Sequence, residues 1–480
     1  MADFNEIIAL VSTEDMTKVY DGISIDTVGK ARPDLDNHLM TPDEQRKNLA
    51  FYAKAATEHV GWDGFSEEHK QAFKDKIVEL YNGISSRVCK QADFMRKVAS
   101  ETAPFIEDRH FALATGAHFY NGGGAREQTS VGKNIGQYPK EELPNLRLNL
   151  VDEEYKTDRD GNRFPAWRIC TAQMKTGEDV LIVSIPNLPN DKSYESSQKF
   201  IEAFDKIYLE NKEKWDKGRI VLDVRGNPGG EDKPIDHVAK RLYGNMINTY
   251  KRCEIRDTEI SNAFLHRHGA YKPANLAQSG FEPDGLVKRK CFSGTNQALF
   301  DETKTFYPFN EEKGYKGRID VLLDRGVGSS AESAYTSFYH HPQVRYIGEN
   351  TSGMQQFTQG SFAMPCGYMM RVGVTKLTYW DKAGENIEVK GHQPDIDCRG
   401  RDALLTAFEL GRDEGRVMTA HQTNEPRSGQ PVFREYDPKT STDPRKAYYA
   451  KYLEPALREV ETRNLANIGL AKQNQQSSLS

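Results

Sequence analysis

The chain lacks the charge excess and the apolar runs that would tie it to a nucleic acid or a membrane. Its 65 basic residues are balanced by 70 acidic ones, which gives a net charge of -5. A surface of this charge has no field that favours a polyanion or an anionic lipid layer. No stretch of the sequence reaches the roughly 18 consecutive apolar residues of a membrane-spanning helix. We therefore expect no nucleic-acid partner and no membrane insertion.

Cysteine is also scarce. Six cysteines are present among 480 residues, and no two of them lie closer than 32 positions apart. The C-x-x-C spacing of zinc sites and dithiol redox centres is therefore missing. Buried free thiols are expected in preference to disulfides.

A positively charged leader is missing too. Asp3 and Glu6 stand where an export signal would carry positive charge. As written, the sequence predicts a cytoplasmic protein, and a periplasmic or secreted location applies if a leader has been removed.

Residues 1–104 have the pattern of a small helical domain. Thr41 and Glu44 form a capping box around Pro42, which predicts a helix through residue 56. A second helix is predicted from Ser66 to Gly83. A third helix is predicted around three apolar residues, Val88, Phe94 and Val98.

Residues 105–412 change to alternating strands and helices. Residues 180–185 and 219–224 are apolar runs typical of strands buried on both faces, and an amphipathic helix is predicted between them. This strand, helix, strand unit has the length of a parallel crossover. The order recurs further on, with predicted strands at residues 319–323 and 344–347 and a helix at about 330–339. The pattern predicts an α/β fold.

The remaining segments carry weaker patterns. An Asp160-Gly161 pair predicts a hairpin turn. Residues 246–316 are polar and weakly periodic, and we expect an insertion or lid over the core. After a helix at residues 404–410, residues 413–480 are predicted to form a polar linker, a terminal helix and a disordered tail.

Two strand-to-loop transitions could carry chemistry, and the first runs from Asp223 to Gly230. It ends a buried strand with the pair Gly229-Gly230. Backbone N–H groups of such a loop can cradle a phosphate or hold an oxyanion. The sequence has neither common phosphate-loop motif, and a simple tight turn is the alternative.

The second transition runs from Gly326 to Glu332 and places Ser329 and Ser330 between a strand and a helix. A serine at a helix N-terminus lies beside backbone amides that stabilise negative charge. Either serine could instead serve only as a helix N-cap. The glycine spacing differs from the G-x-S-x-G elbow of α/β-hydrolases.

Together these segments resemble peptidase family S41, the C-terminal processing and tricorn-type serine peptidases. The family's D-[LV]-R-x-N-x-G-G loop matches residues 223–230, and its serine three residues before a glutamate matches Ser329 and Glu332. Three further family patterns are present: D-x-H at residues 108–110, G-E-x-T-x-G at 348–353 and E-x-x-G-x-x-P-D at 388–395. The resemblance covers residues 105–412.

The resemblance implies a ClpP/crotonase-like mixed sheet core with flanking helices, preceded by a small N-terminal helical domain. It implies a serine peptidase that acts on peptides or unfolded proteins through an acyl-enzyme, without a cofactor or a metal ion, and it is compatible with a homo-oligomer. The implied roles are Ser329 as nucleophile, His110 as general base and Glu388 as the residue that orients the histidine. The implied oxyanion hole consists of backbone amides of Gly229, Gly230 and Ser330.

Two departures from the family patterns affect the general base. Met354 stands where the processing branch carries its catalytic lysine, which excludes a Ser/Lys dyad. His110 and Glu388 match the tricorn-like branch instead. Arg109 occupies the place of a serine that completes the tetrad in the archaeal tricorn enzyme, so the fourth member is missing or supplied from elsewhere.

Several alternatives stay open on the sequence. Ser330 competes with Ser329 as the nucleophile. The fold could serve a non-catalytic ligand or peptide binder, as in interphotoreceptor retinoid-binding protein, or an acyl-CoA enzyme on the related crotonase-like core. The clusters at residues 266–268 and 340–341 lack the helical spacing and carboxylates of a histidine metal site, so we expect no metal there.

Overall fold

The computed structural model describes most of the chain up to residue 409. The described residues are 2–12, 33–115, 118–121, 146–157, 161, 163–188, 195–247, 249–256, 258–261, 298–303, 307–379, 387–388, 390–398, 402–409 and 432–433. The predicted terminal helix and tail, and the histidine cluster at residues 266–268, lie outside them.

The N-terminal helices follow the predicted capping signals. Helix α4 (Pro42–Thr57) begins after Thr41, which accepts the Glu44 N–H on its hydroxyl and donates its own N–H to the Glu44 carboxylate. Helix α5 (Glu67–Asn82) begins after Ser66 and ends at Gly83. Both helix predictions are confirmed. The shorter elements of this region are α1 (Phe4–Ile8), α3 (Pro33–Asp36), β1 (Leu39–Met40), η2 (Trp62–Gly64), β2 (Cys89–Lys90) and η3 (Ala103–Phe105).

The third helix, α6 (Gln91–Thr102), starts later than predicted. Val88 lies before it and is 54% exposed, so its assignment to the helix was wrong. The residues after Val88 form β2 instead, which pairs with β1. The spacing of six between Val88 and Phe94 also fits no helical face.

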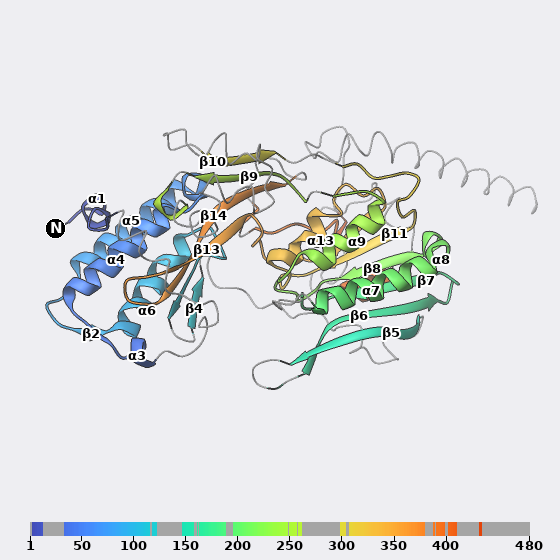
Figure 1. Ribbon diagram of the computed structural model, residues 1–480, viewed down its shortest axis with the longest axis horizontal. Coiled ribbons are helices and arrows are strands. Elements are labelled where there is room, and N and C mark those ends of the chain that lie inside the picture. The colour runs from blue at the N-terminus through green and yellow to red at the C-terminus, as the bar shows by residue number, and fades with distance from the viewer. Residues whose placement is uncertain are drawn as a thin grey trace, which may run out of the picture.

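These helices pack against a sheet built from distant parts of the chain (Figure 1). Its strand order is β10-β9-β14-β3-β4, with β13 paired to β14. The strands are β3 (Ala112–Thr115), β4 (His118–Asn121), β9 (Tyr250–Arg256), β10 (Ala298–Thr303), β13 (Phe357–Ala363) and β14 (Met369–Tyr379). Strands β9 and β10 fall within residues 246–316, where weak periodicity gave no strand prediction.

One hydrophobic core joins the N-terminal helices to this sheet. Phe73 of α5 and Met95 of α6 belong to the same buried cluster as Phe111, Phe357 and Val372. Without the sheet, the apolar side chains of the helices would be exposed to water. We therefore expect the helices and the sheet to fold together.

The second sheet has eight strands in the order β16-β15-β12-β11-β8-β7-β6-β5. Neighbours from β7 to β15 run parallel, while β5, β6 and β16 are antiparallel to their neighbours. Strands β5 and β6 pair antiparallel up to Thr157 and Arg163, on either side of the predicted hairpin turn, whose Asp160 lies outside the described residues. The bounds are β5 (Leu146–Thr157), β6 (Arg163–Met174), β7 (Asp179–Ser184), β8 (Arg219–Asp223), β11 (Arg318–Leu323), β12 (Val344–Gly348), β15 (Ile396–Asp397) and β16 (Val432–Phe433).

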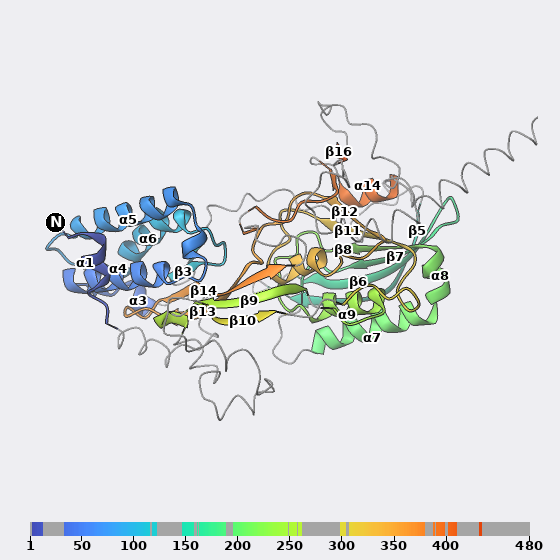
Figure 2. The same cartoon turned by 90° about the horizontal axis from the view of Figure 1, so that it is seen from above.

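Helices cover both faces of this sheet (Figure 2). The larger buried cluster contains side chains of α7 (Glu195–Glu210), α8 (Lys212–Lys217), α9 (Lys233–Tyr243) and α13 (Ser333–Thr336). Helix α14 (Ala403–Glu409) packs on the opposite face. The predicted mixed α/β fold is confirmed. The helix predicted at residues 330–339 is shorter than expected, because its first turn is the 3-10 helix η6 (Ser329–Glu332).

The register of the parallel strands brings three loops to one edge of the sheet. Leu322 of β11 lies opposite Asp223 of β8, and Leu323 lies opposite Gly348 of β12. The loops after β8 and β11 are the two predicted to carry chemistry, and the loop after β12 contains the G-E-x-T-x-G pattern. Ligand sites of open α/β sheets form at this carboxyl edge.

Cys89, Cys170, Cys366 and Cys398 are free, and no helix in the described residues is long and apolar enough to cross a membrane. Cys170 and Cys398 are buried, and burial raises the pKa of each thiol to about 11. The expectation of free thiols is confirmed for Cys89, Cys170, Cys366 and Cys398.

A buried charge network ties three parallel strands together away from this edge. The Asp320 carboxylate of β11 accepts hydrogen bonds from Arg219 of β8 at 3.2 Å and from Arg345 of β12 at 2.8 Å. Burial alone would raise the pKa of Asp320, but the charges of Arg345 and Arg219 hold it below its ordinary value. The stabilisation is therefore present at neutral pH and is lost as the pH falls through the folded-state pKa.

We predict that Asp320→Asn destabilises the protein by about 3–5 kcal/mol, because it removes the buried counter-charge that Arg219 and Arg345 share, while Arg219 keeps its ion pair with Glu178. Urea unfolding at pH 7 measures the change. Asp43→Asn, which removes a surface pair with Arg46, should cost less than about 1 kcal/mol. Equal, small effects of the two substitutions would show that the network adds no stability.

Candidate active site

Ser329 has a backbone conformation that no other described non-glycine residue shares. Its φ is +54°, in the left-handed region, whereas the other positive φ angles in the described chain belong to glycines. Such a conformation costs a residue with a side chain about 1–3 kcal/mol and persists only where neighbours enforce it. Strain of this kind concentrates at functional sites, so the local contacts of Ser329 become important.

Glu332 is the neighbour that enforces this turn. Its buried carboxylate accepts the Ser329 N–H at 3.1 Å and the Met354 N–H at 2.7 Å on one oxygen. The other oxygen accepts the Thr351 hydroxyl at 2.5 Å and the Gly353 N–H at 3.0 Å. Glu332 therefore fastens the serine turn after β11 to the loop after β12.

The glycine loop after β8 lies directly against the serine turn. A Cβ atom on Gly229 would stand 2.7 Å from the Ser329 Cβ and 2.8 Å from the Gly328 carbonyl oxygen, and its φ is +109°. Only glycine allows this approach. The Gly229 N–H donates to Asn227 Oδ1 at 2.9 Å, so it is engaged within the loop. This bond bears on the predicted role of the Gly229 amide as an oxyanion donor.

The Ser330 hydroxyl holds the two loops together. It donates to the Gly230 carbonyl oxygen at 2.8 Å, and its side chain also bonds to Asp232 at the start of α9. Ser333 donates to the same Asp232 carboxylate at 3.0 Å. These contacts give the Ser330 hydroxyl a positioning task.

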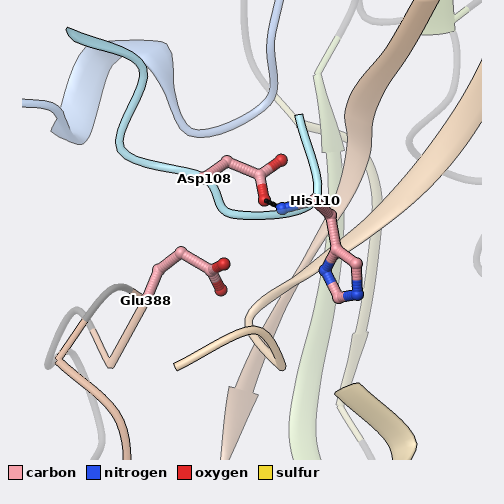
Figure 3. A group of neighbouring side chains, drawn as sticks. All are labelled: Asp108, His110 and Glu388. Atoms are coloured by element: carbon pink, nitrogen blue, oxygen red, sulfur yellow. Dashed lines mark hydrogen bonds between the residues drawn. The ribbon is translucent and has the colours of Figure 1, made fainter. Parts of the chain in front are cut away.

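His110, Asp108 and Glu388 come together in a second group of side chains. Ligand atoms of the three side chains lie within 4.8 Å of one another. Figure 3 shows the Glu388 carboxylate pointing towards Asp108 and the His110 ring. The Asp108 carboxylate accepts the His110 backbone N–H at 2.7 Å, and Glu388 accepts the Arg109 N–H at 3.1 Å. The chain just before β3 is thus held by two carboxylates.

Burial and charge give these two carboxylates opposite pKa shifts. Burial raises the pKa of Glu388 well above its ordinary value, and the charges of Asp108 and Glu332 raise it further. Burial also acts to raise the pKa of Asp108, but the hydrogen bond with His59 and the charge of His110 lower it overall. Between the ordinary glutamate range and the raised pKa of Glu388, folding stability falls as the pH rises, because the folded state holds this proton more tightly.

Residues 354–356 connect the serine turn to the group formed by Asp108, His110 and Glu388. The Met354 N–H donates to Glu332 and the Gln356 N–H donates to Glu388 at 3.0 Å. The side chain between them, Gln355, bonds to Ser333 and to the buried ring of His392. The carboxylates of Glu332 and Glu388, which are distant in sequence, are therefore bound to backbone amides only two residues apart.

Asp108, His110 and Glu388 include the donor types of a metal site, but their contacts favour another use. Each oxygen of Asp108 and Glu388 already accepts a hydrogen bond, from His110 and His59 and from Arg109 and Gln356. A cation there would share every carboxylate oxygen with a hydrogen-bond donor that is already in place. Elsewhere, buried His341 bonds to the Leu242 carbonyl oxygen, and it joins no ligand group within the described chain.

The sequence predictions named the serine turn, the glycine loop, His110 and Glu388, and missed the groups that hold them. Glu332 and Asp108 stood inside quoted motifs but had no role assigned to them. Gln356 acts through its backbone, which no motif reports. His59 bonds to Asp108 at 2.8 Å. It lies in the N-terminal helical region, for which the sequence predicted no catalytic role.

We predict that Gly229→Ala loosens the serine turn, because the new methyl group cannot share space with the Ser329 Cβ. Amide hydrogen exchange at residues 327–333 should become faster, and the melting temperature should fall. Gly177→Ala is the matched control, since Gly177 has a φ of +85° and no atom within 4 Å of an added Cβ. It should cost about 1 kcal/mol without changing exchange at the turn. Similar exchange in both variants would contradict the close approach.

We predict that Glu332→Gln destabilises the protein by about 3 kcal/mol or more, because one end of the amide cannot accept the two donors facing it. Hydrogen bonds to a buried charged group contribute about 1.5–3 kcal/mol each. Chemical denaturation measures the loss. Glu349→Gln removes a carboxylate whose 4.0 Å contact is to the half-exposed Arg325, and it should change stability by less than about 1 kcal/mol. A loss no greater than that in Glu332→Gln would remove Glu332 from its central place.

Comparison with known proteins gives one family and a set of similar folds. Residues 179–398, just under half of the chain, match the model of peptidase family S41. No curated protein matches the chain.

Three solved structures illustrate the similar folds. An inferred peptidase of Parabacteroides merdae has 16% identity and a TM-score of 0.47, with 77% of this chain and 96% of that chain covered. The photosystem II D1 C-terminal processing protease has 10% identity and a TM-score of 0.36, with 75% and 93% covered. The tricorn protease has 14% identity and a TM-score of 0.33, with 76% and 36% covered. All three TM-scores are below 0.5, so residue roles rest on the contacts of this chain.

Proposed function

Residues 179–398 belong to peptidase family S41, and from this premise we propose that the chain cleaves peptide bonds with Ser329 as its nucleophile. The substrates are peptides or unfolded protein segments, in keeping with a chain of low net charge. His110 is the general base, and Glu388 orients its ring and stabilises the imidazolium.

The first half of the reaction forms an acyl-enzyme. His110 takes the proton of the Ser329 hydroxyl as its oxygen bonds to the scissile carbonyl carbon, because a neutral serine hydroxyl is otherwise a weak nucleophile. The carbonyl oxygen becomes an oxyanion that accepts the N–H groups of Gly230 and Ser330. The C–N bond then breaks, and the leaving amine takes the proton from His110.

The second half returns the enzyme to its starting state. His110 removes a proton from a water molecule, whose oxygen bonds to the acyl carbon. When the bond from that carbon to the Ser329 oxygen breaks, His110 returns its proton to the serine. One peptide bond and one water are consumed, and a carboxylic acid and an amine are released. No cofactor or metal ion takes part in these steps.

The strained backbone of Ser329 is the observation that carries this proposal. A positive φ at a serine, enforced by Glu332 and packed against Gly229, is stored strain at the residue the sequence motif marks. A serine that served only as a helix cap would need no such conformation, because N-caps take extended backbone. The competing Ser330 has its hydroxyl bonded to Gly230, which favours Ser329 as the nucleophile.

The raised pKa of Glu388 has a consequence for this mechanism. Glu388 must be ionised to stabilise the His110 imidazolium, and burial with two neighbouring carboxylates opposes that ionisation. When His110 takes the serine proton, its new positive charge favours the ionised form of Glu388.

We predict that a fluorophosphonate probe labels the wild-type protein at Ser329 and fails to label Ser329→Ala. Ser330→Ala should still be labelled, at a rate lower by about tenfold or less, because it loses a loop contact and not the nucleophile. Peptide mapping of the adduct by mass spectrometry identifies the labelled residue. Labelling of Ser329→Ala at full rate, or loss of labelling only in Ser330→Ala, would reject Ser329. A folded wild-type protein that takes no label and cleaves no peptide in a broad library would reject the peptidase itself.

A further inference from the structure

His59 lies far from the serine turn in sequence and bonds to the loop that carries the general base. It follows α4 and is fully buried. Its Nε2 lies 2.8 Å from Asp108 Oδ2, while Asp108 Oδ1 accepts the His110 backbone N–H. The contact therefore runs from the helical region through one carboxylate to His110.

The other nitrogen of His59 fixes the direction of this hydrogen bond. The Gly61 N–H donates to His59 Nδ1 at 2.9 Å, so Nδ1 must be the unprotonated acceptor. The proton of a neutral imidazole then sits on Nε2 and points at Asp108. His59 is thus a neutral ring that donates to a buried carboxylate.

The surroundings leave the His59 ring a single position. Phe357 meets it edge-on at 4.8 Å between ring centroids, and Phe65 packs at 5.1 Å. Gly373 of β14 closes the site, because a Cβ there would stand 2.3 Å from His59 Nε2. The neighbouring Val60 N–H donates to the Gly373 carbonyl oxygen at 2.9 Å. A ring packed only as a hydrophobic filler would not need a glycine above its donor atom.

We propose that His59 is a positioning residue for the general base, and that it acts by holding Asp108 ionised and in place against the His110 backbone. The proposal rests on the peptidase function proposed above. Asp108 and Glu388 are then two carboxylates beside His110, and His59 supplies from the helical region the support that Arg109 cannot give.

The charged and titratable groups that face Asp108 are His59, His110 and Glu388, with Glu332 acting on Glu388. His59 and His110 lower the pKa of Asp108, and Asp108 in turn favours the positive charge that His110 gains when it takes the serine proton. Removing the His59 donor therefore raises the pKa of Asp108. A protonated Asp108 no longer stabilises the His110 imidazolium.

The test compares two amides at position 59 that differ only in reach. In His59→Gln the side-chain amide overlies Nε2 and still donates to Asp108. In His59→Asn it overlies Nδ1, keeps a partner for the Gly61 N–H and falls short of Asp108. The second-order rate of fluorophosphonate labelling at Ser329 is measured from pH 4 to pH 9 for both, with thermal unfolding as the check on folding.

We predict that His59→Asn is labelled about 10- to 100-fold more slowly on the pH plateau, in line with the loss of a hydrogen bond to a buried charge. The pH at which its labelling rate falls on the acid side of the pH–rate profile should be higher than in the wild type. His59→Gln should keep the wild-type profile and most of the labelling rate. His69→Phe is the matched control, since it removes a histidine bonded to the adjacent Glu107 at 2.9 Å, and it should leave the rate and the profile unchanged. Wild-type behaviour of His59→Asn, or equal loss in both amide variants with normal folding, would overturn the proposal.

A second readout does not depend on catalysis. The His110 backbone N–H donates to Asp108, so its proton chemical shift follows the ionisation of that carboxyl. The midpoint of this titration should rise in His59→Asn and stay at the wild-type pH in His59→Gln. If the wild type takes no label, the proposed function fails and this titration still decides whether His59 controls Asp108. An unchanged midpoint in His59→Asn would overturn the inference whatever the labelling shows.

Discussion

Four hydrogen-bond donors converge on the buried carboxylate of Glu332, and the proposed site depends on that convergence. Two donors come from the loop after β12 as backbone amides, one is the Thr351 hydroxyl, and one is the amide of Ser329. The carboxylate can satisfy all four at once because each oxygen has two lone pairs. It holds Ser329 at a positive φ and spaces the serine turn from Glu388 through residues 354–356. A neutral side chain of the same shape could not do both.

A second pair of hydrogen bonds links the helical region to His110, the proposed general base. The N-terminal helices share one hydrophobic core with β3, β13 and β14, so their packing fixes where His59 lies. His59 in turn fixes Asp108, and Asp108 binds the backbone of His110. Under this view the helices are part of the catalytic framework, and a change in their packing alters the position of the base without touching the nucleophile.

The sequence predicted the parts of this protein that depend on local signals. Capping residues located α4 and α5, apolar runs located the parallel strands, and short motifs located the serine turn, the glycine loop, His110 and Glu388. It failed for β9 and β10, because the pairing of β9 with β14 and of β10 with β9 joins residues distant in sequence. It also failed for Val88, which lies before β2 and outside the helix. Glu332, Asp108 and His59 were missed as supporting groups, because a buried hydrogen bond between distant residues leaves no periodic trace in the chain.

The central claim is that Ser329, the amides of Gly230 and Ser330, and His110 act on one carbonyl group. A crystal structure of the protein inactivated by a fluorophosphonate tests it most directly. The account predicts a phosphorus atom bonded to the Ser329 oxygen, a phosphoryl oxygen that accepts the Gly230 and Ser330 N–H groups, and a His110 nitrogen within hydrogen-bond distance of the Ser329 oxygen. An adduct on another residue, or a phosphoryl oxygen facing away from both amides with His110 turned out of reach, would contradict it.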